Sequence, residues 1–255
     1  MKQTDLDIQE FITCFPLALD LKGHSILVTG AGGLIGRTLV RCLRGLDEHY
    51  ALGITLFCPR HQELTAWLTD NANHADYVIH LACPTASREM VEKPVEVIEA
   101  ITDLTKLVLE FVRRTNATMV YASSMEVYGI NHTDELITED YQGYLDPLQV
   151  RSSYPMAKRM AECMCHCYAC EYGVNAKIAR LVQTFGAGIS HDDQRVFAQF
   201  ARSVVDGRDI ILHTEGKTSR KYLYLTDAVS ALLYIMLKGT KGEAYNAAHP
   251  DSYVS

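Results

Sequence analysis

The 255-residue sequence lacks several features that would point to particular protein classes. It has no run of about 18 apolar residues, so no membrane-spanning helix is predicted. Basic residues are not in excess: 24 Lys and Arg stand against 31 Asp and Glu, a formal net charge of −7 that argues against nucleic acid as a partner. The N-terminal residues 1–7 lack the apolar core of a signal peptide. These absences predict a soluble, cytoplasmic protein.

Cysteine is plentiful, with eight residues, four of them between 163 and 170. A zinc site usually combines ligand pairs from separate turns, whereas these cysteines lie on one predicted helix. On that helix Cys163, Cys167 and Cys170 share a stripe, and Cys165 points elsewhere. We therefore predict free thiols that pack in the core or against a second subunit, and no metal site.

The chain is 48% hydrophobic, enough for one large domain or a domain with a small appendage. Strands are predicted over 25–30, 51–58, 77–82, 118–123, 175–181, 210–213, 222–225 and 244–247. Helices are predicted over 5–20, 37–43, 61–70, 94–115, 154–172, 194–206 and 227–238. This alternation is typical of an α/β fold with a doubly wound parallel sheet. The 18 residues between Cys58 and Tyr77 leave room for one helix and no further strand.

A glycine-rich turn follows the first predicted strand, in Gly30-Ala-Gly-Gly33-Leu-Ile-Gly36. Glycines at these positions allow a tight turn, close approach to a pyrophosphate and helix–strand packing. The pattern predicts a dinucleotide site for NAD. The second strand ends in Cys58-Pro59-Arg60 instead of the Asp or Glu that contacts the NAD ribose, and Arg60 could accept a 2′-phosphate, which leaves NADP open.

Tyr154 and Lys158 lie at positions i and i+4 of a predicted helix and share one face. The unperturbed pKa of a tyrosine is about 10, and a nearby ammonium favours the phenolate. The pair is therefore a candidate general base with its electrostatic support. The same spacing recurs at Tyr234 and Lys238, where we predict only a buried helix, so the context of each pair has to decide between them.

Six motifs in order resemble the extended short-chain dehydrogenase/reductase superfamily, in its nucleotide-sugar epimerase, dehydratase and decarboxylase branch. The resemblance covers residues 24 to 250. The motifs are Thr29-Gly-Ala-Gly-Gly-Leu-Ile-Gly36, Val78-Ile-His-Leu-Ala82, Ser123-Ser-Met-Glu-Val-Tyr-Gly129, Tyr154-Pro-Met-Ala-Lys158, Arg180-Leu-Val-Gln-Thr-Phe-Gly186 and Arg220-Lys-Tyr-Leu-Tyr-Leu-Thr-Asp227. It implies a Rossmann domain over 1–180 and a partial nucleotide-sugar-binding region over 181–255, smaller than in relatives, which continue with further helices.

The resemblance also implies roles for individual residues. Ser124 and Tyr154 would hydrogen-bond the 4-hydroxyl of the sugar, and Tyr154 would take its proton. Lys158 would hold the nicotinamide ribose and lower the Tyr154 pKa. The implied cofactor residues are Gly30, Gly33, Leu34, Ile35, Gly36, Leu81, Ala82, Tyr154 and Lys158. The implied substrate residues are Ser124, Arg180, Arg195 and Arg220, with surface ion pairs as the alternative for Arg195 and Arg220. Asp227 is expected to cap a helix.

The step after the 4-keto sugar distinguishes the enzymes of this branch. Dehydratases resemble Thr-Asp-Glu-Val-Tyr-Gly, where the Asp acts as acid; here Met125 cannot donate a proton. The Ser-x-Glu-Val-Tyr-Gly form is more similar to UDP-glucuronate decarboxylases, where Glu126 and Arg220 would assist. Decarboxylation is therefore the preferred interpretation, with 4-epimerisation and 4,6-dehydration as alternatives. A non-catalytic nucleotide-binding protein is the rival of another class.

Relatives in this superfamily pair two helices with their copies. The corresponding helices here are the predicted ones at 94–115 and 154–172. The resemblance therefore implies a homodimer, with the cysteine stripe as one part of its interface.

Overall fold

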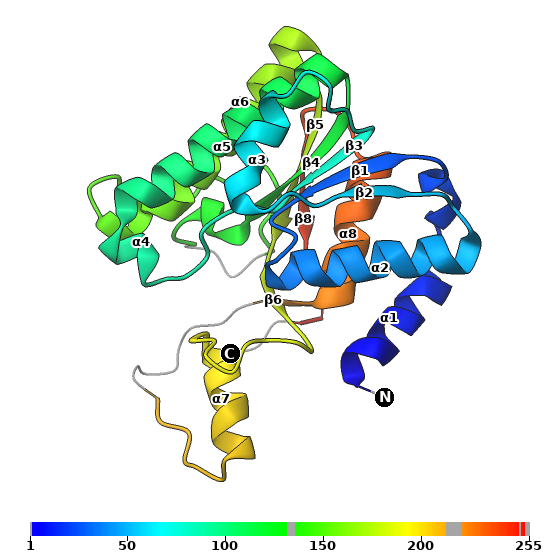
Figure 1. The fold of residues 1–255 in the computed structure, drawn as a ribbon. Helices are drawn as coiled ribbons and strands as arrows, with labels where there is room; N and C mark the ends of the chain where they lie inside the picture. Colours follow the sequence, from blue (N-terminus) through cyan, green and yellow to red (C-terminus); the bar gives the residue numbers. More distant parts are fainter. Residues whose placement is uncertain (1, 132–135, 213–220, 250, 253–255) are drawn as a thin grey trace.

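The fold is built on a six-stranded parallel sheet with strand order β2-β1-β3-β4-β5-β8 (Figure 1). The computed structural model describes residues 2–131, 136–212, 221–249 and 251–252. The strands of this sheet are β1 (Ser25–Thr29), β2 (Thr55–Phe57), β3 (Tyr77–His80), β4 (Thr118–Ser124), β5 (Asn175–Leu181) and β8 (Ala244–Ala247). The doubly wound parallel sheet predicted from the alternation of strands and helices is confirmed.

Helices cover both faces of the sheet, and each face has its own apolar core (Figure 1). One face carries α1 (Gln3–Cys14), α2 (Leu34–Tyr50) and α8 (Leu225–Lys238). The other carries α3 (His61–Thr69), α5 (Pro94–Thr115) and α6 (Ser153–Tyr172), with the short α4 (Glu89–Glu92) before α5. Strands covered on both sides have no polar face, which explains the continuous apolar run Ile26–Val28 of β1, all fully buried.

Several predicted boundaries agree with the structure and some do not. The helix at 94–115 and the strand at 175–181 are confirmed to the residue. The helix predicted over 5–20 is wrong in its second half, because α1 ends at Cys14 and a separate 3₁₀ turn, η1, follows at Ala18–Leu21. The strand predicted over 210–213 is also wrong where the structure describes it: 210–212 are irregular, and His213 lies outside the described residues.

A smaller unit follows β5 and lies apart from the main sheet in Figure 1. It consists of β6 (Gln183–Phe185) paired in parallel with β7 (Tyr222–Tyr224), together with α7 (Val196–Val205). The chain then returns through α8 to β8, which pairs with β5. The main sheet therefore takes strands from both sides of residue 180, where the sequence predicts the domain boundary.

Two predictions for helix α8 are wrong. Tyr234 and Lys238 do not lie on a buried face: Tyr234 is 54% exposed, and Lys238 forms an ion pair of 2.6 Å with Asp20. Asp227 is not the cap of its helix, because Tyr224 occupies that position and Asp227 lies in the first turn. There its charge still complements the helix dipole. Within the described residues, no helix is both long and apolar enough to cross a membrane.

Candidate active site

The candidate site lies at the carboxyl edge of the sheet, where the strand order changes direction. β1 pairs with β2 on one side and with β3 on the other, which defines a topological switch point. Ligands of open α/β sheets bind in the crevice outside this point. The glycine turn after β1 and Ser124 at the end of β4 both belong to this edge.

The glycine turn is shaped so that side chains are excluded from it. Gly30 has a φ of +73°, and a Cβ there would come within 2.7 Å of the Ala82 backbone nitrogen. A Cβ on Gly36 would collide with the Gly30 carbonyl oxygen. Gly33 occupies the N-cap position of α2, so the first amides of this helix face the turn. Bare backbone at a helix N-terminus fits the pyrophosphate of a dinucleotide.

A buried histidine supports the strands beneath this turn. His80 is almost fully buried; its Nδ1 lies 2.7 Å from the Thr29 hydroxyl and its Nε2 lies 3.3 Å from the Thr105 hydroxyl. Burial lowers the pKa of His80 to about 3, so the imidazole is neutral at physiological pH. The Thr29 hydroxyl also accepts hydrogen bonds from the amides of Leu81 and Ala82. These contacts hold the carboxyl ends of β1 and β3 in place next to the glycine turn.

The structure brings Ser124, Tyr154 and Lys158 together at the start of α6. Tyr154 is only 7% exposed, and the Ser124 hydroxyl is close enough to lower the pKa of its phenol. The Lys158 ammonium lies 5.8 Å from the centre of the Tyr154 ring and donates a 2.8 Å hydrogen bond to the Ala122 carbonyl. Both Ser124 and Ala122 come from β4, so one strand positions the hydroxyl and the ammonium.

The predicted lowering of the Tyr154 pKa by Lys158 is wrong for this arrangement. Burial raises the pKa of Tyr154, and the electrostatic effects of Cys83 and Glu126 raise it further. The opposing effects come from Ser124 and from Arg151. Lys158 donates to the backbone of β4 instead. With a raised pKa, Tyr154 can act as a base only in the small fraction of molecules in which its phenol is ionised.

Glu126 has a partner that the sequence analysis missed. Arg151, in the 3₁₀ turn η3 (Val150–Ser152) that leads into α6, forms an ion pair of 2.9 Å with Glu126 in the turn η2 (Met125–Tyr128). Both side chains are partly exposed, at 41% and 36%. Arg151 precedes Tyr154 by three residues, and that spacing was the one signal that could have identified it. The Arg151–Glu126 pair therefore places one positive and one negative charge at the edge of the Ser124–Tyr154 site.

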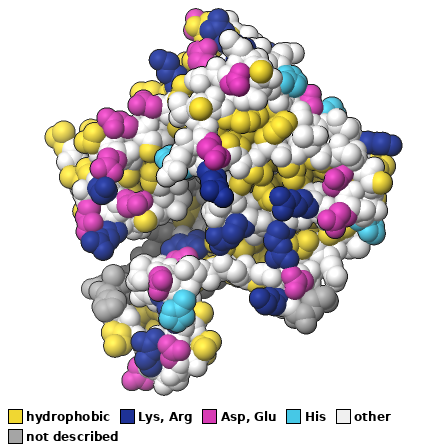
Figure 2. Space-filling model, in the orientation of Figure 1, with side chains coloured by type: hydrophobic (Ala, Val, Ile, Leu, Met, Phe, Trp, Pro, Cys, Tyr) yellow, Lys and Arg dark blue, Asp and Glu magenta, His cyan; other side chains and the backbone are white. Residues whose placement is uncertain are grey.

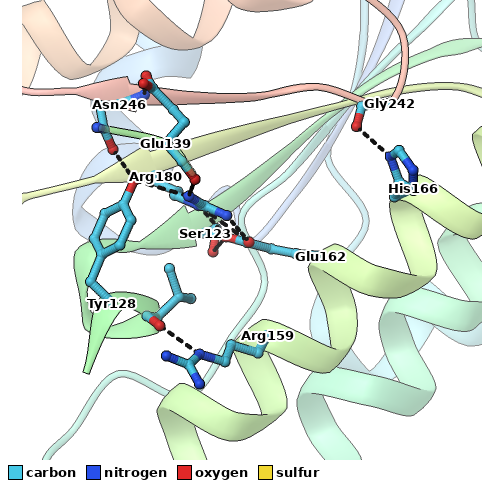
Figure 3. Close-up of polar contacts among 10 residues, drawn as sticks. Ser123, Tyr128, Glu139, Arg159, Glu162, His166, Arg180, Gly242 and Asn246 are labelled. Atoms are coloured by element: carbon cyan, nitrogen blue, oxygen red, sulfur yellow. Dashed lines mark hydrogen bonds and ion pairs between the residues drawn. The ribbon is translucent and has the colours of Figure 1, made fainter. Parts of the chain in front are cut away.

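Arg180 lies in an internal network behind this rim (Figure 3). Its guanidinium pairs with Glu162 of α6 at 2.7 Å, and both side chains are about nine-tenths buried. It also donates to the Tyr128 hydroxyl at 2.9 Å and to the Glu139 carbonyl at 2.6 Å. At most one of its five N–H groups is left for a substrate. The geometry thus favours a positioning role for Arg180, and direct substrate contact stays a prediction.

The same network ties the loop after η2 to the sheet. The Tyr128 hydroxyl donates to the Asn246 side chain of β8 at 2.6 Å, and the backbone N–H of Asn246 donates to the Glu139 carboxylate at 2.7 Å (Figure 3). From α6, Arg159 donates to the carbonyls of Val127 and Gly143 at 2.6 and 2.7 Å. Polar contacts from β5, β8 and α6 therefore hold the turn that carries Glu126.

The remaining predicted residues are placed differently. Arg195 is the N-cap of α7, and its guanidinium is engaged by the Asp193 carboxylate at 2.6 Å and the Thr184 carbonyl at 2.7 Å. Arg220 lies outside the described residues. Leu34 and Ile35 open α2 directly after the glycine turn, and both are partly exposed.

The structure decides between the two predicted locations of the cysteine stripe within this chain. Cys165 is fully buried, whereas Cys163, Cys167 and Cys170 are exposed. The stripe is therefore not part of this chain's own core. Nowhere in the described parts of the chain do three His, Cys, Asp or Glu side chains group in a way that could hold a metal ion.

A glycine cradle at a switch point, beside a Ser–Tyr–Lys group, defines a dinucleotide-binding α/β protein of the short-chain dehydrogenase/reductase type. The model of the NAD dependent epimerase/dehydratase family matches residues 26–248. The chain belongs to that family, which is NAD-dependent and whose cofactor the glycine cradle fits at the pyrophosphate.

Two curated relatives are similar over most of the chain. UDP-glucuronic acid decarboxylase 1 of Danio rerio is 29% identical over 225 residues, which cover 83% of this chain and 53% of the relative. UDP-glucuronic acid decarboxylase 6 of Arabidopsis thaliana is 29% identical over 245 residues, which cover 89% of this chain and 70% of the relative. The chain thus spans about half the length of the first of these relatives.

Solved structures show the same fold at lower identity. UDP-N-acetylglucosamine 4-epimerase from Methanobrevibacter ruminantium M1, in complex with UDP-N-acetylmuramic acid, gives a TM-score of 0.73 at 20% identity, over 89% of this chain and 77% of that chain. The dTDP-glucose 4,6-dehydratase of Bacillus anthracis, in complex with NAD, gives 0.74 at 19% identity, over 90% and 76%.

Proposed function

We propose that this chain forms the catalytic part of an enzyme that modifies a nucleotide-diphosphate sugar through a 4-keto intermediate, with UDP-glucuronate decarboxylation as the reaction. The observation that carries the choice of reaction is the Glu126–Arg151 ion pair at the rim of the Ser124–Tyr154 site. The similarity to UDP-glucuronic acid decarboxylases supports it.

In this proposal the first step is oxidation at C4 of the sugar. The Ser124 hydroxyl orients the 4-hydroxyl group, and Tyr154 takes its proton. Lys158 would hold the ribose next to the nicotinamide. NAD, when bound, would supply a reversible hydride acceptor for C4.

The second step is loss of the carboxylate attached to C5. The new ketone is β to this carboxylate, so the electrons of the breaking C–C bond flow toward the ketone oxygen and carbon dioxide leaves. Arg151 attracts the carboxylate to the rim, and the like charge of Glu126 beside it favours departure of neutral carbon dioxide. The resulting enolate then takes up a proton from water at C5, which restores the ketone at C4. The methionine at 125 offers no acid for dehydration.

To test decarboxylation directly, UDP-glucuronate labelled at the carboxyl carbon is incubated with NAD and the purified protein. We expect labelled carbon dioxide and a UDP-pentose in equal amounts, measured by mass spectrometry. In Arg151→Gln the KM for UDP-glucuronate should rise about 10- to 100-fold, because a charge-assisted contact to the substrate carboxylate is lost.

UDP-glucose, which has no carboxylate, is the matched control, and its binding should change little in Arg151→Gln. Conversion of UDP-glucose to a 4-keto-6-deoxy product would identify a dehydratase, and its epimerisation would identify an epimerase. Cofactor binding without turnover of either sugar would identify a nucleotide-binding protein.

We also propose that the chain forms a homodimer through α5 and α6. These adjacent helices carry exposed apolar side chains: Val95 and Ile98 on α5, and Met156 and Met160 on α6. The exposed Cys163 and Cys167 continue this face, which makes their packing against a second copy consistent with the cysteine stripe. A contiguous apolar surface of this kind is typical of an interface.

Light scattering after size exclusion at micromolar concentration is expected to give the mass of a dimer for the wild type. Met160→Glu should give the mass of a monomer, because two carboxylates would face each other in a dry interface. Val204→Glu, on the exposed side of α7, should stay dimeric. A monomeric wild type would contradict the proposal.

A further inference from the structure

The second half of α6 carries two outward-facing pairs of side chains that are common metal ligands. Cys163 and Cys167 lie one helical turn apart, and their sulfur atoms are 3.9 Å from each other. His166 and Cys170 repeat this spacing, with Nε2 of the imidazole 3.5 Å from the thiol sulfur. All four side chains are exposed. Neither pair takes part in the sugar chemistry proposed above, so both are available for another ligand.

The Cys163–Cys167 pair is poorly placed for a disulfide. A disulfide needs Cβ atoms about 3.5–4.5 Å apart, whereas positions i and i+4 of a helix hold them about 5–6 Å apart. Oxidation of this pair would therefore distort α6. The pair also belongs to the face proposed for the homodimer, where a second copy would cover it. The His166–Cys170 pair is the better candidate for a ligand from solution.

The imidazole of His166 is held in one orientation by the backbone. Its Nδ1 lies 3.0 Å from the Gly242 carbonyl oxygen, in the loop before β8 (Figure 3). A carbonyl oxygen only accepts hydrogen bonds, so Nδ1 carries a proton and Nε2 is the nitrogen left to bind a metal ion. Gly242 is fixed in turn, because its N–H donates to the Ala176 carbonyl of β5 at 2.8 Å. A metal-bound histidine typically donates its other N–H in this way, which sets the orientation of the ring.

The distance between the two candidate ligand atoms fits one edge of a zinc tetrahedron. Zinc bonds are about 2.3 Å to a thiolate sulfur and about 2.0–2.1 Å to an imidazole nitrogen, which at the tetrahedral angle puts sulfur and nitrogen about 3.5 Å apart. The separation between Cys170 and His166 is 3.5 Å. Zinc can therefore take the place of the thiol proton with little movement of either side chain. Binding breaks the S–H bond, forms one Zn–S and one Zn–N bond, and releases the proton to water.

We propose that His166 and Cys170 chelate a thiophilic divalent cation of the zinc class on the outer surface of α6. In the described ranges no third His, Cys, Asp or Glu joins them in a group that could hold a metal ion, so water fills the other coordination positions. A structural zinc site with four protein ligands is a different arrangement, which this helix does not provide. The cation site is independent of the cofactor and of the sugar substrate.

The test is calorimetric titration with Zn²⁺ of the double variant with Cys163→Ser and Cys167→Ser, which removes the neighbouring thiol pair. We expect one ion per chain. Adding either His166→Ala or Cys170→Ser should raise the Kd at least about tenfold, because one of two protein ligands is lost. In the nitrogen NMR spectrum of the imidazole groups, the His166 Nε2 signal should shift with Zn²⁺ while Nδ1 keeps its proton.

Cys14→Ser in the same double variant is the matched control, since Cys14 is an exposed thiol on another helix. Its Kd for Zn²⁺ should stay within about twofold. Histidine side chains lie singly among the coloured side chains on the face that Figure 2 shows, so no group of imidazoles competes for the ion there. An unchanged Kd in both His166→Ala and Cys170→Ser, with the fold intact by circular dichroism, would overturn the proposal. A His166 Nε2 signal that does not move at saturating Zn²⁺ would overturn it as well.

Discussion

Tyr154→Phe is expected to lower turnover of UDP-glucuronate by about 10²- to 10⁴-fold, the range that a general acid–base group contributes. The ring is 7% exposed, so phenylalanine fits the same space and only the hydroxyl is lost. Cofactor affinity should fall by no more than about tenfold, the loss of one hydrogen bond, because the glycine turn is untouched. Steady-state kinetics and calorimetric titration with NAD would measure the two effects separately.

The chain provides its own control for this variant. Tyr234 and Lys238 repeat the Tyr154–Lys158 spacing on α8, but Lys238 pairs with Asp20 and Tyr234 is largely exposed. Tyr234→Phe should therefore leave turnover unchanged. Equal losses in both tyrosine variants, or full activity of Tyr154→Phe, would remove Tyr154 from the proposed mechanism.

The pH dependence of the wild type follows from the raised pKa of Tyr154. Burial disfavours the phenolate, so the fraction of Tyr154 that can act as a base grows as pH rises from neutrality. We expect kcat/KM to increase with pH up to at least about pH 9. This dependence should disappear in the residual activity of Tyr154→Phe.

Arg180→Met is expected to lower the free energy of unfolding by about 3–5 kcal/mol. Both partners of the Arg180–Glu162 pair are about nine-tenths buried, so removal of the cation leaves an uncompensated carboxylate in the interior. Tyr128 and the Glu139 carbonyl lose a donor as well. Urea denaturation followed by circular dichroism would measure the change.

A second variant separates the ion pair from simple packing. Replacing Glu162 and Arg180 together by Met removes both charges, and most of the lost stability should return, since apolar residues often replace a buried pair at little cost. Arg88→Met, in the exposed Arg88–Glu92 pair of α4, should not shift the unfolding midpoint measurably. A double variant no more stable than Arg180→Met would contradict a charge-based origin of the effect.

Local sequence patterns were sufficient for the architecture. The apolar run before Gly30 and the glycines at 30, 33 and 36 depend on neighbours close in sequence, and the structure places them as strand, turn and helix. The helical spacing likewise placed Tyr154 and Lys158 on one helix. The missing strand between Cys58 and Tyr77 was predictable from length alone, and β2 is indeed the edge of the sheet.

The choice of polar partners was decided by tertiary structure. Lys158 bonds to Ala122, 36 residues away in the chain, and Glu126 pairs with Arg151, 25 residues away. Burial depends on the same long-range packing, which is why Cys165 is buried while the stripe beside it is exposed. Periodicity fixes which side chains share a face of a helix. Which of those faces is desolvated, and which charge lies opposite it, follows only once the sheet has brought distant segments together.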